Sequence, residues 1–232
     1  MYIKYIFTLI FFSALHPART QQAERIDFDR INDKKVITLL KEYGAEYKSD
    51  LARLTSRCYS GEDSLSFSSH TKTLVIDGPI EEVWNVYKTI SPTEDDEDKV
   101  RFGILYSPNP DKLYYLSDAY DGIKEGQVVF WNLRFLFGLV QVAVGQKIME
   151  VNDNNKFLKI CYLAEGKSHG TQYIQLYPME NGQTKIVHYT RYRSASKFRD
   201  RRLYPKLHDK AITEFHEDVI ERVEEIQQKE AQ

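Results

Sequence analysis

Histidines are the side chains of this sequence best suited to proton transfer or metal binding. Five of the six lie beyond residue 20: His70, His169, His188, His208 and His216. None of them belongs to a His-Glu-x-x-His motif or another spacing typical of metal ligands. His208 and His216 are eight residues apart, about two helical turns, so one side of a helix could carry both. We expect these two at the surface, and we predict no metal and no other cofactor.

His188 lies in a stretch with the pattern of a β-strand and faces either a cavity or the solvent. In a cavity it would orient a ligand, and at the surface it would be an ordinary hydrogen-bonded histidine. The sequence has no Gly-x-Ser-x-Gly elbow, no phosphate-binding glycine loop and no dinucleotide fingerprint. We therefore predict no catalytic residue.

Aromatic side chains are the second group with a candidate binding role, since the chain has 16 Tyr and 12 Phe. They fill cores and also line pockets, in which a few polar groups orient the ligand. Arg134 and His188 would supply those polar contacts here. The alternative, in which the aromatics are ordinary core or surface residues of strands, stays open. The residues that we expect around a ligand are Tyr114, Trp131, Arg134, Tyr173, His188, Phe215 and Val219.

Residues 191–202 form the most distinctive charged segment. It could contact an anionic head group, a membrane surface or an acidic partner. It could also be a solvated strand end whose arginines pair with acidic faces of neighbouring helices. Six basic residues stand there beside one acid: Arg191, Arg193, Lys197, Arg199, Arg201 and Arg202.

The element best placed to organise these side chains is a long amphipathic helix predicted at residues 203–228. Pro205 stands near its start, where a missing N–H costs nothing. The helix has one face to bury, because apolar residues recur every three or four positions: Leu207, Ala211, Phe215, Val219, Val223 and Ile226.

β-patterned stretches precede this helix and could cover its apolar face. Short connections made of turn residues join the last four stretches, which predicts antiparallel neighbours. Asp77-Gly78-Pro79 should end the first strand and begin a helix whose apolar stripe is Ile80, Val83, Trp84 and Tyr87. The predicted strands are residues 70–77, 101–107, 112–118, 127–137, 139–151, 156–163, 170–177 and 184–193.

Three segments lie outside this pattern. Residues 1–20 resemble a secretory signal peptide, with Lys4 before an apolar run of about a dozen residues. Residues 21–62 should form a helical extension that packs on the main domain at 63–232. Asn32 or Asp33 would cap its helix, which Gly44 could split in two. The five acids at residues 94–98 lack the alternation and the glycine of a calcium loop, so we predict a solvated loop.

Export and charge limit the choice of partners. Removal of residues 1–20 takes away Lys4 and Arg19 and changes the formal net charge from −2 to −4. This acidity argues against nucleic acid as a main partner. No later stretch has the length of a transmembrane helix, so we expect a soluble protein, secreted or periplasmic. Cys58 and Cys161 could form a disulfide there, or Cys161 could be a small core residue of its strand.

In order and spacing, these elements resemble the helix-grip fold of the START/SRPBCC superfamily. Residues 73–87, Thr-Leu-Val-Ile-Asp-Gly-Pro-Ile-Glu-Glu-Val-Trp-Asn-Val-Tyr, are similar to that superfamily's opening strand and its apolar-x-x-P-x-E-x-V-W helix start. The resemblance covers roughly residues 65–230. It implies an α+β fold in which a curved antiparallel sheet wraps around a long C-terminal helix, with a hydrophobic cavity between them. It implies no single chemistry.

The sequence thus favours an exported, non-enzymatic protein that holds an apolar or amphipathic, lipid-like small molecule in this cavity. One alternative is an enzyme of the cyclase or hydrolase kind that uses the same cavity, for which the sequence offers no clear acid or base. Another is a protein-interaction module whose core is filled and whose basic segment or N-terminal helices make the contact. The sequence does not determine the oligomeric state.

Overall fold

The structure, a computed structural model, describes residues 23–61, 66–92, 100–135, 138–194 and 196–231. The signal peptide predicted at residues 1–20 and the acidic loop predicted at residues 94–98 lie outside these ranges. None of the described helices is long and apolar enough to cross a membrane.

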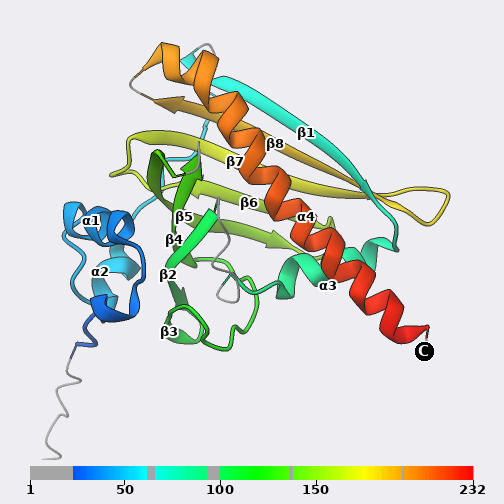
Figure 1. The fold of residues 1–232 in the computed structure, drawn as a ribbon, viewed down its shortest axis with the longest axis horizontal. Coiled ribbons are helices and arrows are strands. Elements are labelled where there is room, and N and C mark those ends of the chain that lie inside the picture. Colours follow the sequence, from blue (N-terminus) through cyan, green and yellow to red (C-terminus); the bar gives the residue numbers. More distant parts are fainter. Residues whose placement is uncertain (1–22, 62–65, 93–99, 136–137, 195, 232) are drawn as a thin grey trace, which may run out of the picture.

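One curved sheet of eight antiparallel strands forms the centre of the molecule, and a long C-terminal helix crosses it diagonally (Figure 1). The strand order is β1-β8-β7-β6-β5-β4-β2-β3, so that the first and last strands of the sequence pair directly. The α+β helix-grip architecture predicted from the sequence is confirmed. The strands are β1 (Ser68–Ile76), β2 (Val100–Pro108), β3 (Asp111–Tyr114), β4 (Val128–Phe135), β5 (Val140–Asn152), β6 (Phe157–Tyr162), β7 (Ser168–Pro178) and β8 (Thr184–Ser194).

Two helices lie on the concave side of the sheet. Pro79 precedes α3 (Ile80–Thr89), and two acids in its first turn favour the positive end of the helix dipole. A short π-helix, η3 (Arg199–Leu203), leads into α4 (Tyr204–Glu230). Val219 and Val223 of α4 pack with Trp84 of α3 in a common core, and this contact fixes α4 across the sheet.

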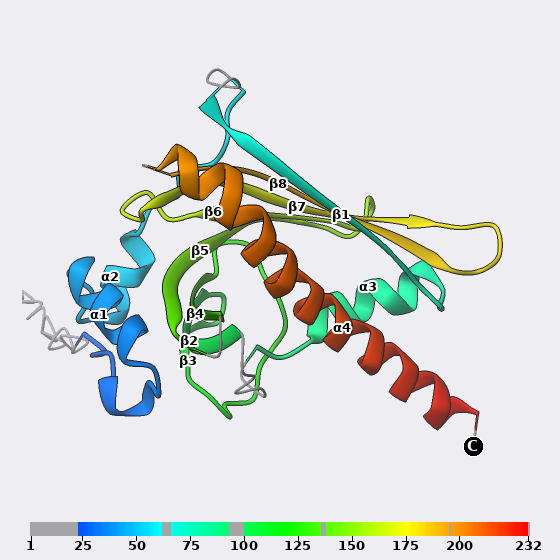
Figure 2. The ribbon, with the colours of Figure 1, turned by 45° about the horizontal axis from the view of Figure 1, so that its top comes forward.

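Residues along each strand alternate between the two faces of the sheet. In β4, Val129 and Trp131 point toward α4, whereas Phe130 and Asn132 point to the other side. We call the first side the inner face and the second the outer face. Figure 2 shows α4 within the curve of the sheet, and α1 and α2 outside it beyond β4 and β5.

The N-terminal helices cover the outer face over β2 to β5. They are η1 (Phe28–Arg30), α1 (Lys34–Glu42) and α2 (Lys48–Arg53). Gly44, with φ of 65°, lies between α1 and α2, so the split expected at this glycine occurs. Together with the strands these helices build an aliphatic and aromatic core in which Val36, Leu40 and Leu51 are fully buried.

Asp33 joins α1 to the sheet with both of its carboxylate oxygens. Oδ1 caps the helix by accepting from the backbone N–H groups of Lys35 and Val36. Oδ2 accepts from Asn132 Nδ2 of β4 at 2.7 Å. A side chain at Gly103 would bring Cβ to 2.6 Å from a Val36 methyl carbon, so glycine at this position lets α1 lie directly on β2.

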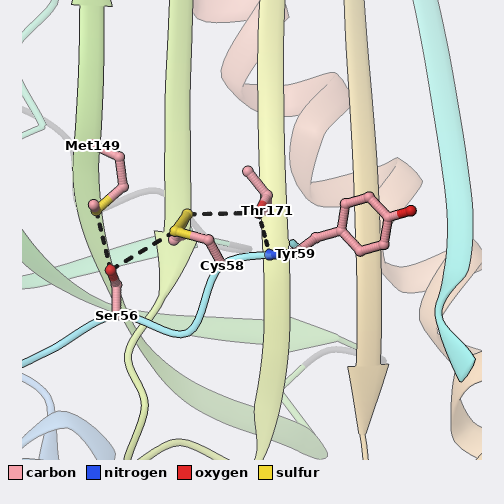
Figure 3. Close-up of a disulfide and its surroundings, with 6 residues drawn as sticks. Ser56, Cys58, Tyr59, Met149 and Thr171 are labelled. Carbon is pink, nitrogen blue, oxygen red and sulfur yellow. Dashed lines mark hydrogen bonds between the residues drawn. A yellow bond between two sulfur atoms is a disulfide. The ribbon is translucent and has the colours of Figure 1, made fainter. Parts of the chain in front are cut away.

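The segment after α2 crosses the outer face of β5, β6 and β7 (Figure 3). Cys58 of this segment forms a disulfide with Cys161 of β6, which decides between the two interpretations of the cysteines. Beside it, the Tyr59 N–H donates to Thr171 Oγ1 at 2.8 Å, and Ser56 Oγ donates to Met149 Sδ at 3.1 Å. The N-terminal extension is therefore covalently attached to the middle of the sheet.

The predicted strand at residues 112–118 is too long. β3 ends at Tyr114 because the chain turns there. Asp118 Oδ2 accepts from the Tyr115 N–H, the Asp118 N–H donates to the Tyr115 carbonyl, and Ser117 has φ of 68°. Local side-chain to backbone hydrogen bonds of this kind compete with a β-ladder.

Candidate ligand-binding site

A cavity of about 210 Å³ lies between the inner face of the sheet and α4. Most of its surface is apolar, and its wall comes from five strands from β4 to β8, from β2, from α3 and from α4. Pro92 and Val100, which flank residues 93–99, also line it. Its polar lining includes Tyr87, Gln127, Gln172, His188, His208 and Glu214.

Three of the seven residues expected around a ligand line this cavity: Trp131, His188 and Phe215. Val219 is fully buried one turn further along α4, in the core shared with α3. Tyr114 is also fully buried, but its hydroxyl donates to Asp121 Oδ2 at 2.6 Å outside the cavity lining. Contact with a ligand itself stays a prediction for all seven.

Strand alternation places the other two expected residues, Arg134 and Tyr173, on the outer face. Arg134 follows the phase of Asn132, and its guanidinium lies against Gly138. Tyr173 stacks between Phe157 and Tyr189 of the neighbouring strands, with ring centroids 6.1 and 6.0 Å away. Neither side chain is among the residues that line the cavity.

A chain of buried hydrogen bonds forms one wall of the cavity and joins α3, α4, β8 and β7. The Tyr87 hydroxyl lies 2.6 Å from His216 Nδ1. His216 Nε2 lies 3.0 Å from His188 Nδ1, and His188 Nε2 lies 2.9 Å from Gln172 Oε1. All of these side chains are less than a tenth exposed. Four elements far apart in the sequence thus meet through polar side chains inside an apolar core.

These hydrogen bonds must run in one direction. The amide oxygen of Gln172 can only accept, so the proton of His188 is on Nε2. His188 Nδ1 then accepts from His216 Nε2–H, and His216 Nδ1 accepts from the hydroxyl of Tyr87. This is the arrangement for neutral imidazoles, which burial favours by lowering both pKa values, and each ring uses both of its nitrogens.

A second pair of histidines, His208 and His70, joins α4 to β1. Their Nδ1 atoms lie 3.3 Å apart, and His70 Nε2 lies 3.5 Å from Asp209 Oδ1. Lys72 also pairs with Asp209 at 3.2 Å. His208 is 6% exposed and His216 is fully buried, so the surface position expected for these two is wrong. His208 and His216 point inward because they lie on the side of α4 that packs against the sheet.

Burial keeps the four clustered histidines uncharged at neutral pH. It lowers the pKa of His208 to about 3, with neighbouring His70 and His216 adding to the effect. It also lowers the pKa of His216 to about 3, aided by Lys72. The pKa of His188 lies well below its ordinary value, and that of His70 is lowered as well, in both cases chiefly because of burial.

Tyrosines extend the polar wall toward the start of α4. The hydroxyls of Tyr162 and Tyr204 are hydrogen-bonded to each other. The ring of Tyr204 stacks between those of Tyr192 and His208, with centroids 3.6 and 4.9 Å away. Burial raises the pKa of Tyr162 to about 12, so this hydroxyl stays protonated. Stacking on both faces holds the Tyr204 ring in place beside the His208 imidazole.

The basic segment lies apart from the cavity. On the outer face, Arg191 lies over the ring of Tyr59 at 5.1 Å, and Arg193 lies over that of Phe67 at 4.7 Å. The side chains of Lys197, Arg201 and Arg202 are exposed around η3, and Arg199 contributes to its backbone. The basic side chains that the structure describes therefore lie on the outer face and around η3, and none of them lines the cavity.

Within the described ranges, no group of three or more His, Cys, Asp and Glu side chains is placed to hold a metal ion. Sequence reasoning missed His70, Tyr87 and Gln172 as members of the histidine cluster. Only their contacts across β1, α3 and β7 reveal them, because nothing in the local sequence marks them as partners of a histidine.

No protein-family model and no curated protein sequence matches the chain. Solved structures do resemble it. TTHA0849 from Thermus thermophilus is 17% identical, with a TM-score of 0.50, over 67% of this chain and 97% of that one. Norcoclaurine synthase from Thalictrum flavum is 12% identical, with a TM-score of 0.47, over 75% and 96%. A START superfamily protein from Mycobacterium smegmatis is 11% identical, with a TM-score of 0.46, over 68% and 98%.

TTHA0849 thus shows that the chain shares its fold with a solved structure. At these identities the similarity says nothing about a ligand or a reaction. The matched structures are covered almost completely, whereas a quarter to a third of this chain has no counterpart in them. The site must therefore be interpreted from its own residues.

Proposed function

We propose that this protein is a non-enzymatic binding protein that holds a small apolar or amphipathic molecule between the sheet and α4. The observation that supports this most directly is the cavity of about 210 Å³, lined mainly by aliphatic and aromatic side chains. A cavity of this kind costs stability, because its lining atoms lack partners on one side. An occupant would recover those contacts.

The volume limits the size of the occupant. Drug-sized pockets span roughly 300–1,000 Å³, and a dry apolar cavity of about 150 Å³ holds benzene. A cavity of about 210 Å³ therefore suits one substituted ring or a short branched chain better than a whole lipid. Affinity would come from the apolar area removed from water, at about 25 cal/mol per Å².

We also propose that the protein works outside the cytoplasm. The disulfide between Cys58 and Cys161 supports this, since such bonds persist in oxidising compartments. The signal-peptide pattern at residues 1–20 supports it independently. Fractionation of the native host, with the mature N-terminus read by mass spectrometry, tests this. Retention of residues 1–20 in a cytoplasmic fraction would contradict it.

The cavity proposal is tested by filling the cavity with a side chain. Ala211 of α4 lines it and is 7% exposed, so we expect Ala211→Leu to weaken binding of 4-ethyltoluene at least tenfold in calorimetric titration. Ala52→Leu, the same change at an exposed position of α2, is the control and should leave affinity unchanged. Equal affinity of both variants and the parent, or no binding by the parent, would contradict the proposal.

A second candidate is an acid–base enzyme that uses the same cavity. The observation in its favour is the neutral His208 imidazole in the cavity wall, since a neutral imidazole can accept a proton. Its lowered pKa makes it a weak base, which favours binding over catalysis. Turnover of a bound ligand that disappears in His208→Phe would establish the enzyme instead.

A further inference from the structure

We propose that the cavity selects an uncharged molecule carrying a hydrogen-bond donor, such as a phenol or another alcohol, and that His208 Nε2 accepts this hydrogen bond. This inference rests on the proposed binding function and specifies its ligand class. It combines three features of the described part of the site: a ring nitrogen without a partner, a lining without lysine or arginine, and neighbouring polar groups that already have partners.

His208 Nε2 is buried and has no hydrogen-bond partner among the described residues. Its protonation state follows from its neighbours. Asp209 can only accept, which favours a proton on His70 Nε2 and leaves His70 Nδ1 as an acceptor. His208 Nδ1 must then carry the proton that lies between the two Nδ1 atoms. His208 Nε2 is consequently a lone-pair acceptor, and a ligand must offer it a donor.

Three other polar side chains of the wall, Gln127, His188 and Gln172, already have hydrogen-bond partners. Gln127 Oε1 accepts from the Tyr120 hydroxyl and the Lys124 N–H, and its Nε2 donates to the Gly122 carbonyl. His188 and Gln172 satisfy each other. Leaving a buried acceptor unpaired costs about 1–3 kcal/mol, so a donor on the ligand gains more at His208 than at these three side chains.

Charge in the lining argues against an anionic ligand. Among the described lining residues, the acids Glu214 and Asp218 of α4 are present and no lysine or arginine is. The nearest cation of the histidine cluster, Lys72, is paired with Asp209. A carboxylate in the cavity would lose its hydration beside two other acids, which is costly. An uncharged hydroxyl avoids this cost.

A matched set of three probes tests this ligand class: 4-ethylphenol, 4-ethyltoluene, in which a methyl replaces the hydroxyl, and the 4-methylbenzoate anion. We expect 4-ethylphenol to bind at least as tightly as 4-ethyltoluene, although its hydroxyl is costlier to remove from water. The anion should bind at least tenfold more weakly than either. If 4-ethyltoluene binds and 4-ethylphenol binds much more weakly, or if the anion binds tightly, the inference is overturned and the proposed function stays intact.

Variants of His208 assign the effect to its Nε2 atom. In His208→Phe, the affinity of 4-ethylphenol relative to 4-ethyltoluene should fall about tenfold, and His208→Gln, which restores an acceptor, should recover much of it. His169→Phe, on β7 outside the cavity lining, is the control and should not change the ratio. An unchanged ratio in a folded His208→Phe protein would refute the role of His208. Failure of the parent to bind any probe would instead refute the proposed function.

Discussion

The two faces of the sheet are both covered, but in opposite ways. On the outer face, α1 and α2 fill the space over β2 to β5 with aliphatic and aromatic side chains, and a disulfide holds the segment that follows. On the inner face, α4 covers the sheet but leaves a cavity and a group of buried neutral histidines. The outer face is closely packed, whereas the inner face contains a cavity and is packed less completely.

This difference matters because buried polar groups and cavities both cost free energy. A fully packed interior needs neither. Among the described residues, a cavity and a group of buried histidines occur together on the inner face. Under the proposed function, this is where stability is exchanged for ligand binding. The N-terminal extension over the outer face would help to offset that cost.

Acid should have the largest effect, because it destabilises the inner face through its buried histidines. The pKa values of His208 and His216, about 3, lie below the value of about 6.5 expected in the unfolded chain. Between these values the unfolded state binds more protons, so the free energy of unfolding rises with pH and is lost as pH falls from about 6.5 toward 3. At pH 5 each histidine should cost about 2 kcal/mol, or about 4 together.

Urea unfolding at pH 7.5 and pH 5 measures this loss. In His208→Phe, the loss of unfolding free energy between pH 7.5 and pH 5 should shrink by the contribution of this one histidine, about 2 kcal/mol, whatever the effect of the substitution itself. A wild-type stability that is the same at both pH values would show that these histidines are not held neutral by burial.

Loss of the disulfide should lower the stability of the protein without changing ligand binding on the inner face. The disulfide closes a loop of 103 residues, so reduction should lower the free energy of unfolding by about 3–4 kcal/mol. The affinity for 4-ethyltoluene should change less than twofold while the protein stays folded, because the bond lies on the face opposite the cavity. A Cys58→Ala, Cys161→Ala variant, insensitive to reductant, is the control. Loss of binding in the folded, reduced protein would contradict the separation of the faces.

Equivalent leucine truncations compare the packing of the two faces directly. Leu40 on the outer face and Leu158 in the cavity wall are both almost fully buried. We expect Leu40→Ala to cost about 3 kcal/mol and Leu158→Ala about 2, because Leu158 already lacks partners on its cavity side. Chemical denaturation gives both numbers. A larger cost at Leu158 would mean that the inner face is the better packed one.

The smallest effect on the free energy of unfolding is expected where α1 lies against the sheet at Gly103. We expect Gly103→Ala to cost about 2 kcal/mol, because its Cβ would meet the Val36 methyls. Truncation of the opposing side chain in a Gly103→Ala, Val36→Ala variant should relieve the clash, so the double variant should be more stable than the sum of the single effects predicts. Strict additivity would show that α1 does not rest on Gly103.

Local sequence patterns predicted most of the fold. Asp77-Gly78-Pro79 marked the step from β1 to α3, and the three-to-four-residue spacing around Phe215 marked α4. The site was harder to predict. The strand containing Tyr173 carries large side chains on both faces, so its sequence could not say which of them points inward.

The histidine cluster could not be predicted at all from local patterns. His70, His188 and His208 come from β1, β8 and α4, and only strand register and the rotation of α4 bring them together. The disulfide was one of two interpretations of the cysteines, which are 103 residues apart, and only the structure decides between them. Contacts between distant segments carry no signature in a single sequence.

The most direct test of a ligand-binding inner face is a methyl NMR titration with 4-ethyltoluene. Methyl signals of Ile160, Ile174 and Ile212, which line the cavity, should shift on binding. Those of Leu40 and Leu51, in the core of the outer face, should stay in place. Shifts confined to the outer face, or no shifts at saturating probe, would contradict the assignment of binding to the inner face.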